Sequence, residues 1–266
     1  MQAERVRDYI VNWLREYRQN SGTKGFVVGV SGGIDSAVTS ALAARTGAPV
    51  LLLEMPIHQH PAQVSRARDH IQQLCTVYPN VSEERVELSA VFESFIAAMP
   101  AVPNEAGRAM ALVNSRARLR MTTLYYFAGM HGYLVAGTGN KIEDFGVGFF
   151  TKYGDGGVDL SPIADLLKSE VYELGAVLGV NEAIMQAAPT DGLWGDDRSD
   201  EDQIGASYPE LEWAMKVVGE ERETERETGF TERQKEVLAI YRRMNKANRH
   251  KMEAIPVCVI PVDVRG

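Results

Sequence analysis

Short apolar runs alternate with segments of helical character over the first half of the chain. The runs at 26–30 (FVVGV) and 49–55 (PVLLLEM) are continuous and lie next to glycine or proline, which is typical of buried strands. Further strands are predicted around 86–88 and at 133–136. Segments with helical spacing or strong helix formers lie between these strands, at 37–45, 62–74 and about 105–130. The alternation predicts an α/β fold, a doubly wound parallel sheet with helices on both faces.

The two ends and the middle of the chain have other patterns. Residues 1–20 carry apolar side chains on one helical face and charges between them, which predicts a packed amphipathic helix. The segment 146–162 is rich in glycine with Thr, Lys and Asp, and irregular segments of this length are often functional. We expect a single domain over 1–266, made of an N-terminal helix (1–20), a core (26–190), and a helical C-terminal part with an extended tail packed on the surface (191–266).

Composition and charge exclude several classes of protein. The net charge is −8, whereas a nucleic-acid-binding surface needs clustered Lys and Arg, so we expect no nucleic-acid partner. Cys75 and Cys258 belong to no CxxC or Cys/His cluster, so no thiolate metal site is predicted. No apolar run approaches the ~20 residues that span a bilayer, and residues 1–20 do not resemble a signal peptide. We therefore expect a cytoplasmic protein without membrane contact.

The segment after the first predicted strand gives the strongest chemical signal. Residues 31–36 read SGGIDS and join a strand to a helix. Adjacent glycines let a ligand approach the backbone, and Ser hydroxyls with N–H groups at a helix N-terminus bind oxyanions. Asp35 would repel a bare phosphate, so its presence indicates that Mg²⁺ bridges it to the ligand. The segment therefore predicts a site for magnesium pyrophosphate.

Other phosphate-binding loops are absent from the sequence. Neither GxxxxGK[ST] nor GxGxxG occurs, which disfavours kinase-type transfer and Rossmann dinucleotide binding. SGGxDS between a strand and a helix resembles the motif of the PP-loop ATP pyrophosphatases, which have the adenine nucleotide alpha hydrolase-like fold. These enzymes release pyrophosphate and leave AMP on the substrate. The alternative is a glycine-rich turn with a capping Ser or Asp and no ligand.

The remaining motifs resemble those of the ammonia-dependent NAD synthetases. The segment 149–159 (FFTKYGDGGVD) matches that family almost residue for residue. Further matches follow in family order, at 137–141 (GTGNK) with Glu143, 114–121 (NSRARLRM), Pro162 with Lys168, Pro189-Thr190 and His250-Lys251. Thiolating relatives need a catalytic Cys and a basic RNA surface, and GMP and asparagine synthetases usually carry glutaminase domains. The sequence offers none of these features.

The resemblance implies a role for each matching residue. The loop would hold the ATP phosphates through Gly29, Val30, Ser31, Gly32, Gly33, Ile34, Asp35 and Ser36. Further contacts with ATP would come from Thr138, Lys168 and Thr190, and Mg²⁺ would be held by Asp35 and Glu143. Deamido-NAD would be bound by Arg118, Lys152, Asp159, His250 and Lys251.

The resemblance also implies a reaction. The nicotinate carboxylate of deamido-NAD would attack the α-phosphate of ATP and release pyrophosphate, and ammonia would convert the adenylate into NAD and AMP. Lys168 and Asp35 would act at the phosphates, and Asp155 is our candidate for the base that takes a proton from ammonium. A homodimer is implied, with the apolar faces of helices 1–20 and 105–130 as candidate contacts. Without a glutaminase domain, free ammonia is the expected donor, and a separate glutaminase partner stays open.

Several alternatives stay open at this point. Lys168 could merely begin a helix, Arg118 could lie along the long helix, and His250-Lys251 could cap the last one. The interval from Glu143 to Lys152 is about one residue longer than the family pattern, and the sequence after Thr190 also departs from it. Two other functions compete with NAD synthesis: another PP-loop amidotransferase, and a non-catalytic adenine-nucleotide-binding module.

Overall fold

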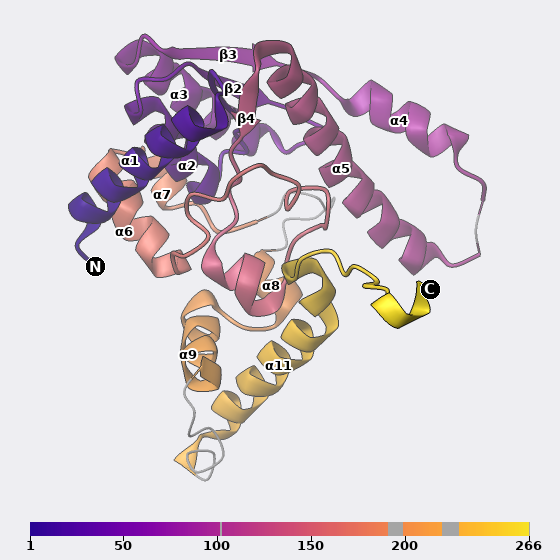
Figure 1. Ribbon diagram of the computed structural model, residues 1–266. Coiled ribbons are helices and arrows are strands. Elements are labelled where there is room, and N and C mark those ends of the chain that lie inside the picture. Colours follow the sequence, from indigo (N-terminus) through magenta and orange to yellow (C-terminus); the bar gives the residue numbers. More distant parts are fainter. Residues whose placement is uncertain (102, 191–198, 220–228, 266) are drawn as a thin grey trace.

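Four parallel strands in the order β3-β2-β1-β4 form the sheet of this protein. The computed structural model describes residues 1–265 except 102, 191–198 and 220–228 (Figure 1). The strands are β1 (Gly25–Gly29), β2 (Val50–Glu54), β3 (Val81–Arg85) and β4 (Tyr133–Val135). Because parallel strands share their carboxyl edge, the segments that follow β1, β2 and β4 meet there.

Helices cover both faces of the sheet, which confirms the predicted α/β class. On one face lie α1 (Ala3–Ser21), α2 (Ile34–Arg45), α3 (Pro61–Val77) and α6 (Lys168–Leu178). The other face is covered by α4 (Ser89–Ala98) and α5 (Glu105–His131). Strand residues alternate between the two cores, since Phe26 and Val28 pack in the first and Val27 in the second.

A third hydrophobic cluster lies beyond the edge of the sheet, in the C-terminal part of the chain. It joins the π-helix η1 (Ile142–Val147) to α9 (Tyr208–Gly219) and α11 (Glu232–Met252), which pack side by side (Figure 1). The short helix α8 (Asp200–Ile204) adds Ile204 to this cluster, and the 3₁₀ turn η3 (Val262–Val264) lies near the end of the chain. The short helix α7 (Glu182–Met185) packs instead in the first core, against α2 and α6. No described helix is long and apolar enough to cross a membrane.

One predicted strand was misplaced, and one helix after it was not predicted. The third strand is β3 at Val81–Arg85, not 86–88, and only Val81 of its residues is buried. An exposed edge strand has no apolar run, so the apolar pattern placed the strand too late, at the buried Leu88. The N–H of Leu88 donates to the carbonyl oxygen of Pro56, just after β2. Helix α4 follows and was not predicted, because it buries only Phe92 and leaves other apolar side chains exposed.

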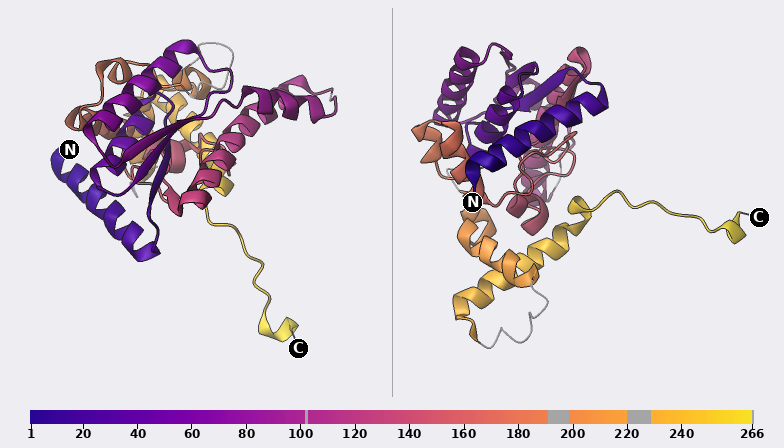
Figure 2. Two further views of the ribbon diagram at one scale, coloured as in Figure 1. Left: turned by 90° about the horizontal axis from the view of Figure 1, so that it is seen from above. Right: turned by 60° about the vertical axis from the view of Figure 1, so that its left-hand side comes forward.

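The chain termini differ in how they pack. The N-terminal helix is confirmed, and it buries Ile10, Val11 and Leu14 against α2 and α6. The tail at 253–265 is extended as expected, but it does not pack on the surface. Figure 2 shows it projecting away from the body, and Ile255 and Val257 are 66% and 78% exposed. Apolar composition suggested packing, but the described part of the chain offers this tail no partner surface.

Candidate active site

The loop between β1 and α2 adopts a conformation that only its glycines permit. Gly32 has φ +84°, and a Cβ there would lie 2.5 Å from the backbone carbonyl oxygen of Gln63. The Ser36 hydroxyl donates to the carbonyl oxygen of Gly33 at 3.0 Å and accepts from the N–H of Ser31 at 3.1 Å, which closes the loop. The N-cap residue of α2 is Gly33, which has no side chain that could cap the helix. Free N–H groups of its first turn are therefore available to an anion.

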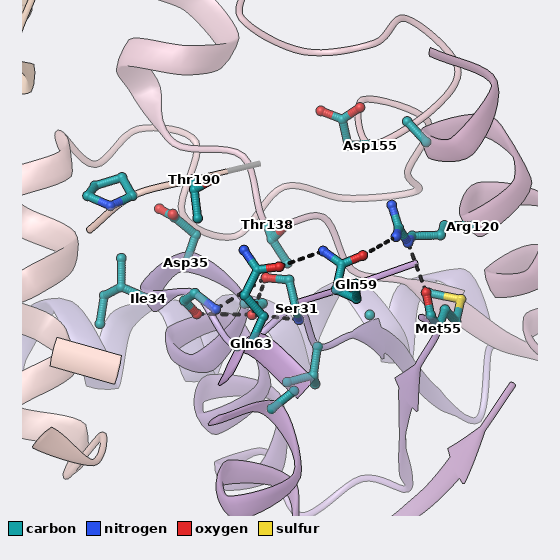
Figure 3. Close-up of a pocket in the computed structure, with 18 of the residues that line it drawn as sticks. Ser31, Ile34, Asp35, Met55, Gln59, Gln63, Arg120, Thr138, Asp155 and Thr190 are labelled. Carbon is teal, nitrogen blue, oxygen red and sulfur yellow. Dashed lines mark hydrogen bonds between the residues drawn. The ribbon is translucent and has the colours of Figure 1, made fainter. Parts of the chain in front are cut away.

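A cavity of about 280 Å³ opens over this loop at the carboxyl edge of the sheet. Its walls come from the ends of β1, β2 and β4, from α3 and α5, and from residues 187–190 (Figure 3). The cavity brings together the residues predicted for ATP, for the metal and for catalysis, namely those at 29–36 with Thr138, Glu143, Asp155, Lys168 and Thr190. Residues as far apart in the sequence as Gly29 and Thr190 thus line one cavity, as the motifs predicted.

Lys168 forms a buried ionic cluster at this cavity. Its side chain is 4% exposed, and its Nζ donates to Asp35 Oδ2 at 2.5 Å and to Glu143 Oε1 at 3.0 Å. The Tyr208 hydroxyl also donates to Glu143 Oε1, at 2.5 Å, and the ammonium lies 4.7 Å from the centroid of that ring. Asn140 Nδ2 donates to Asp35 Oδ1 at 3.1 Å. Each charge in the cluster is therefore paired, as buried charges require.

The pKa shifts in this cluster follow from burial and pairing. Burial opposes the charge on Lys168, but the two carboxylates outweigh it and raise the pKa of the ammonium above its ordinary value. Burial raises the pKa of Asp35, and Lys168 offsets only part of this rise. Burial also acts on Glu143, yet Lys168 and the Tyr208 hydroxyl hold the pKa of Glu143 below its ordinary value. The lysine stays positively charged at neutral pH and faces the phosphate-binding loop.

Asp155 lies at the opposite side of the cavity from Asp35 (Figure 3). It sits in a series of turns, where its Oδ1 accepts a hydrogen bond from the N–H of Thr151 at 3.0 Å. Burial of the carboxyl raises the pKa of Asp155 to about 6, although the residue keeps contact with solvent. A carboxylate with this pKa is ionised at neutral pH and can accept a proton.

Four of the five residues predicted for deamido-NAD gather where the 149–159 segment meets α11 and α5. Arg118 donates to the carbonyl oxygen of Lys152 at 3.3 Å, and Lys152 Nζ donates to that of His250. Lys251 Nζ donates to the carbonyl oxygens of Gly148 and Phe150, at 2.9 and 2.8 Å. This cluster does not belong to the described lining of the cavity. Through these hydrogen bonds, Arg118, Lys152 and Lys251 fix the backbone of the 149–159 segment and of the end of α11. Their contact with deamido-NAD stays a prediction.

Asp159, the fifth of these residues, lies apart from the other four in its contacts. Its carboxylate accepts from the N–H of Val135 at 2.8 Å and from the Tyr125 hydroxyl at 3.0 Å. These bonds tie the end of β4 to α5. The carboxylate thus has a structural task, and its predicted contact with deamido-NAD is untested.

A π-helix lies at the start of the interval from Glu143 to Lys152, which is longer than the family pattern leads us to expect. In η1, the N–H of Gly148 donates to the carbonyl oxygen of Glu143, five residues earlier, and Gly148 has φ +64°. A π turn holds one residue more than an α turn, so an insertion there widens the helix without shifting its ends. Glu143 consequently still reaches Lys168 at 3.0 Å.

Several polar residues at the site were not singled out in the sequence, among them Gln59, Gln63, Arg120 and Tyr208. Arg120 lies in the matching segment 114–121, so the motif could have identified it. Gln59 and Gln63 follow β2 in a segment without a motif. Tyr208 reaches the cluster from the distant helix α9. Among the described residues, no group of three or more His, Cys, Asp or Glu side chains could hold a metal ion. A cation here would be held by the carboxylates of Asp35 and Glu143 together with oxygens of a bound nucleotide.

A parallel sheet with SGGIDS at the β1–α2 loop, faced by a buried lysine and two carboxylates, defines an α/β protein of the PP-loop ATP pyrophosphatase class. Comparison with known proteins narrows the class. The model of the NAD synthase family matches residues 6–255, and the chain belongs to that family.

Its relatives match it over most of their length. An "NH(3)-dependent NAD(+) synthetase" of Carboxydothermus hydrogenoformans is 37% identical over 93% of this chain and 94% of the relative. That of Methanosarcina mazei is 34% identical over 97% and 98%. Among solved structures, an NMN synthetase from Francisella tularensis gives a TM-score of 0.81 at 30% identity, over 98% of this chain and 99% of the other. An NH3-dependent NAD synthetase from Campylobacter jejuni gives 0.76 at 25%, over 97% and 100%.

Proposed function

We propose that this chain catalyses the ATP-dependent amidation of deamido-NAD by ammonia, giving NAD, AMP and pyrophosphate through an adenylated intermediate. The observation that carries the proposal is the buried Lys168, which is held by Asp35 and Glu143 beside the SGGIDS loop in one cavity. The names of the curated relatives support the same reaction. Enzymes of this kind are ligases that form a carbon–nitrogen bond.

Activation of the carboxylate is the step in which these residues act. A carboxylate is a poor electrophile, so one of its oxygens must become part of a leaving group. That oxygen attacks the α-phosphate of ATP, and the bond from the α-phosphorus to pyrophosphate breaks. Negative charge develops on the phosphate oxygens, and the Lys168 ammonium and the N–H groups of α2 stabilise it. Ammonia then attacks the carbonyl carbon, and AMP leaves with the oxygen that came from the carboxylate.

Mg²⁺ fits the donor set of this site. Carboxylate oxygens of Asp35 and Glu143 both contact the Lys168 ammonium, so the two carboxylates lie close to each other. Oxygen is the ligand type that Mg²⁺ prefers. We propose that these two residues hold the ion together with oxygens of ATP. When bound, the ion neutralises charge on the departing pyrophosphate. Lys168 keeps the two carboxylates from repelling one another before the nucleotide arrives.

Asp155 is our candidate for the base in the second step. Ammonium has no lone pair, so it must lose a proton before nitrogen can attack the adenylate. The Asp155 carboxylate lines the same cavity, and its pKa of about 6 leaves it ionised at pH 7. The candidate residues for deamido-NAD are Arg118, Lys152, Asp159, His250 and Lys251, as the motifs predict.

A homodimer is part of the proposal. Part of the apolar face of α1 is buried in the first core through Ile10, Val11 and Leu14, whereas Tyr9 and Tyr17 stay exposed. Apolar side chains stay exposed on α4 and α5, which supports a contact through these helices: Val91, Phe95, Met99, Met110, Tyr126 and Met130. Free ammonia is the proposed donor, and a separate glutaminase partner stays an open alternative. The cytoplasm remains the expected location.

A second acceptor is favoured by one specific observation. The Francisella tularensis structure with a TM-score of 0.81 is named an NMN synthetase. Amidation that yields NMN would take nicotinate mononucleotide, which has the same carboxylate but lacks the AMP half of deamido-NAD. The chemistry of the cavity would be unchanged, and only the binding of the second half would differ.

The test is a comparison of acceptors with the purified protein, ATP, Mg²⁺ and an ammonium salt. Amide product and pyrophosphate are measured with deamido-NAD in one series and nicotinate mononucleotide in the other. We expect NAD and pyrophosphate in equal amounts, and a higher kcat/KM for deamido-NAD. A preference for the mononucleotide would assign the chain to NMN synthesis. Pyrophosphate without either amide would indicate another PP-loop amidotransferase, and neither product would favour a binding module.

A further inference from the structure

A chain of hydrogen bonds crosses one wall of the cavity from α5 to α3 (Figure 3). Arg120 of α5 donates through Nε to the carbonyl oxygen of Met55 at 3.0 Å and through Nη2 to Gln59 Oε1 at 2.7 Å. Gln59 Nε2 donates in turn to Gln63 Oε1 at 2.8 Å. All four residues line the cavity. Arg120, Gln59 and Gln63 therefore form a connected relay, to which the chemistry proposed above assigns no task.

The relay fixes the orientation of both amide groups. A guanidinium group only donates hydrogen bonds, so Gln59 must turn its carbonyl oxygen to Arg120 and its NH₂ group to Gln63. Gln63 must then accept with its own oxygen, which leaves its NH₂ group for the cavity. Gln63 is 9% exposed, and no bond from its Nε2 to another described residue is present. The NH₂ group therefore opens to the cavity, where a ligand can supply an acceptor in place of water.

The position of Gln63 indicates which part of a ligand it meets. The backbone carbonyl oxygen of Gln63 lies against Gly32, so Gln63 stands directly beside the phosphate-binding loop. Next to it, Gly29 faces apolar groups, Met55 Cε at 3.2 Å and Leu124 Cδ2 at 3.6 Å from where a Cβ would be. An apolar floor beside a phosphate loop suits the base and ribose of a nucleotide. Gln63 and these apolar side chains line the same cavity.

We propose that the Gln63 amide donates a hydrogen bond to the nucleoside part of ATP, and that Arg120 is a positioning residue that aims this donor through Gln59. The inference rests on the proposed use of ATP. The acceptor is a ring nitrogen of adenine or an oxygen of ribose. Deamido-NAD, ammonia and the pyrophosphate group have no part in it, so the relay sets affinity for ATP and not the rate of the chemical steps.

The test is a double-mutant cycle on ATP binding. Dissociation constants for ATP with Mg²⁺ are measured by calorimetry for Gln63→Leu, Arg120→Met and the double variant. Loss of one hydrogen bond predicts an increase of about 2- to 12-fold in the dissociation constant of each single variant. The double variant should be no more than about 2-fold weaker than the weaker single one, because the relay acts as a unit. The kcat at saturating ATP and the KM for deamido-NAD should stay as in the wild type.

Two further variants separate the donor from mere packing. Gln63→Glu keeps the shape and still accepts from Gln59, but it presents an acceptor to the ligand, so it should bind ATP more weakly than Gln63→Leu. Arg120→Lys keeps a donor and should lose less affinity than Arg120→Met. Gln72→Leu, the same change on the exposed side of α3, is the control and should leave binding unchanged. Thermal midpoints without nucleotide show whether each variant is folded.

Inorganic pyrophosphate with Mg²⁺ is the probe for the site of contact. We expect its dissociation constant to be the same in the wild type and in Gln63→Leu. Equal weakening of pyrophosphate and ATP, or effects of Arg120→Met and Gln63→Leu that multiply, would overturn the inference. A wild type that binds ATP but makes no amide product would refute the proposed function and leave the relay intact, whereas a wild type that does not bind ATP would refute both.

Discussion

Replacement of Lys168 by Met should unbalance the ionic cluster at the active site. The change keeps the length of the side chain but removes its charge, so Asp35 and Glu143 lose the ammonium that lies 2.5 and 3.0 Å from their oxygens. Removal of one partner from a buried ion pair typically costs about 3–5 kcal/mol, because a charge is left buried and unpaired. We expect a loss of this size in the free energy of unfolding at about pH 8.

The loss should depend on pH in a definite direction. Without Lys168, the two carboxylates repel each other, and their pKa values in the folded variant rise above the values of about 3.9 and 4.3 in the unfolded chain. A raised folded pKa gives stability that is present at low pH and is lost as pH rises through the folded value. The deficit of the variant relative to the wild type should therefore shrink between about pH 8 and about pH 5.5.

The assay is urea unfolding of the wild type and the variant at these two pH values. Lys141→Met is the matched control, since Lys141 pairs with Asp165 at 2.8 Å on the exposed surface and should contribute at most about 1 kcal/mol. Turnover should fall by about 10²- to 10³-fold in Lys168→Met, the usual effect of losing one group that stabilises developing charge. A variant no less stable than Lys141→Met, or a deficit that does not change with pH, would refute the account of this cluster.

Three further changes test other parts of the molecule. Asp155→Asn should abolish most ammonia-dependent turnover. The wild-type rate should decline as pH falls through about 6, because the base becomes protonated, and the variant should lose this decline. An unchanged pH profile would exclude Asp155 as the base. Gly32→Ala forces a Cβ to 2.5 Å from a carbonyl oxygen at φ +84°. Denaturant unfolding should therefore show that the free energy of unfolding falls by about 2 kcal/mol or more, and ATP should bind more weakly. Wild-type values would contradict the loop geometry. Phe95→Glu on α4 should convert the proposed dimer into monomers in sedimentation, while a dimer that persists would place the contact elsewhere.

The sequence predicted the interior of the fold better than its edges. β1 and β2 are buried on both faces, so their apolar runs were continuous and visible. β3 lies at the edge of the sheet and exposes all of its residues except Val81, so its position depends on pairing with β2 and not on a pattern of its own. The tail at 253–265 carried an apolar pattern without the packing that such patterns usually indicate.

The candidate site was predictable where contiguous motifs carry it. Residues 29–36, Glu143, Asp155 and Lys168 meet in one cavity because parallel strands bring their carboxyl ends to one edge. The relay from Arg120 to Gln63 depends instead on side chains from α5, on the segment after β2 and on α3, and no spacing in the sequence links these segments. The departure from the family pattern after Thr190 begins at residues 191–198, which lie outside those that the structure describes.

The central claim is that the acceptor carboxylate attacks the α-phosphate of ATP, and the fate of the carboxylate oxygen tests it most directly. Deamido-NAD with both carboxylate oxygens replaced by the heavy isotope is converted with ammonium, ATP and Mg²⁺, and the products are analysed by mass spectrometry. The account predicts one heavy oxygen in AMP, one in the amide of NAD and none in pyrophosphate. Heavy oxygen in orthophosphate, with ADP as the other product, would show attack at the γ-phosphate and would contradict it.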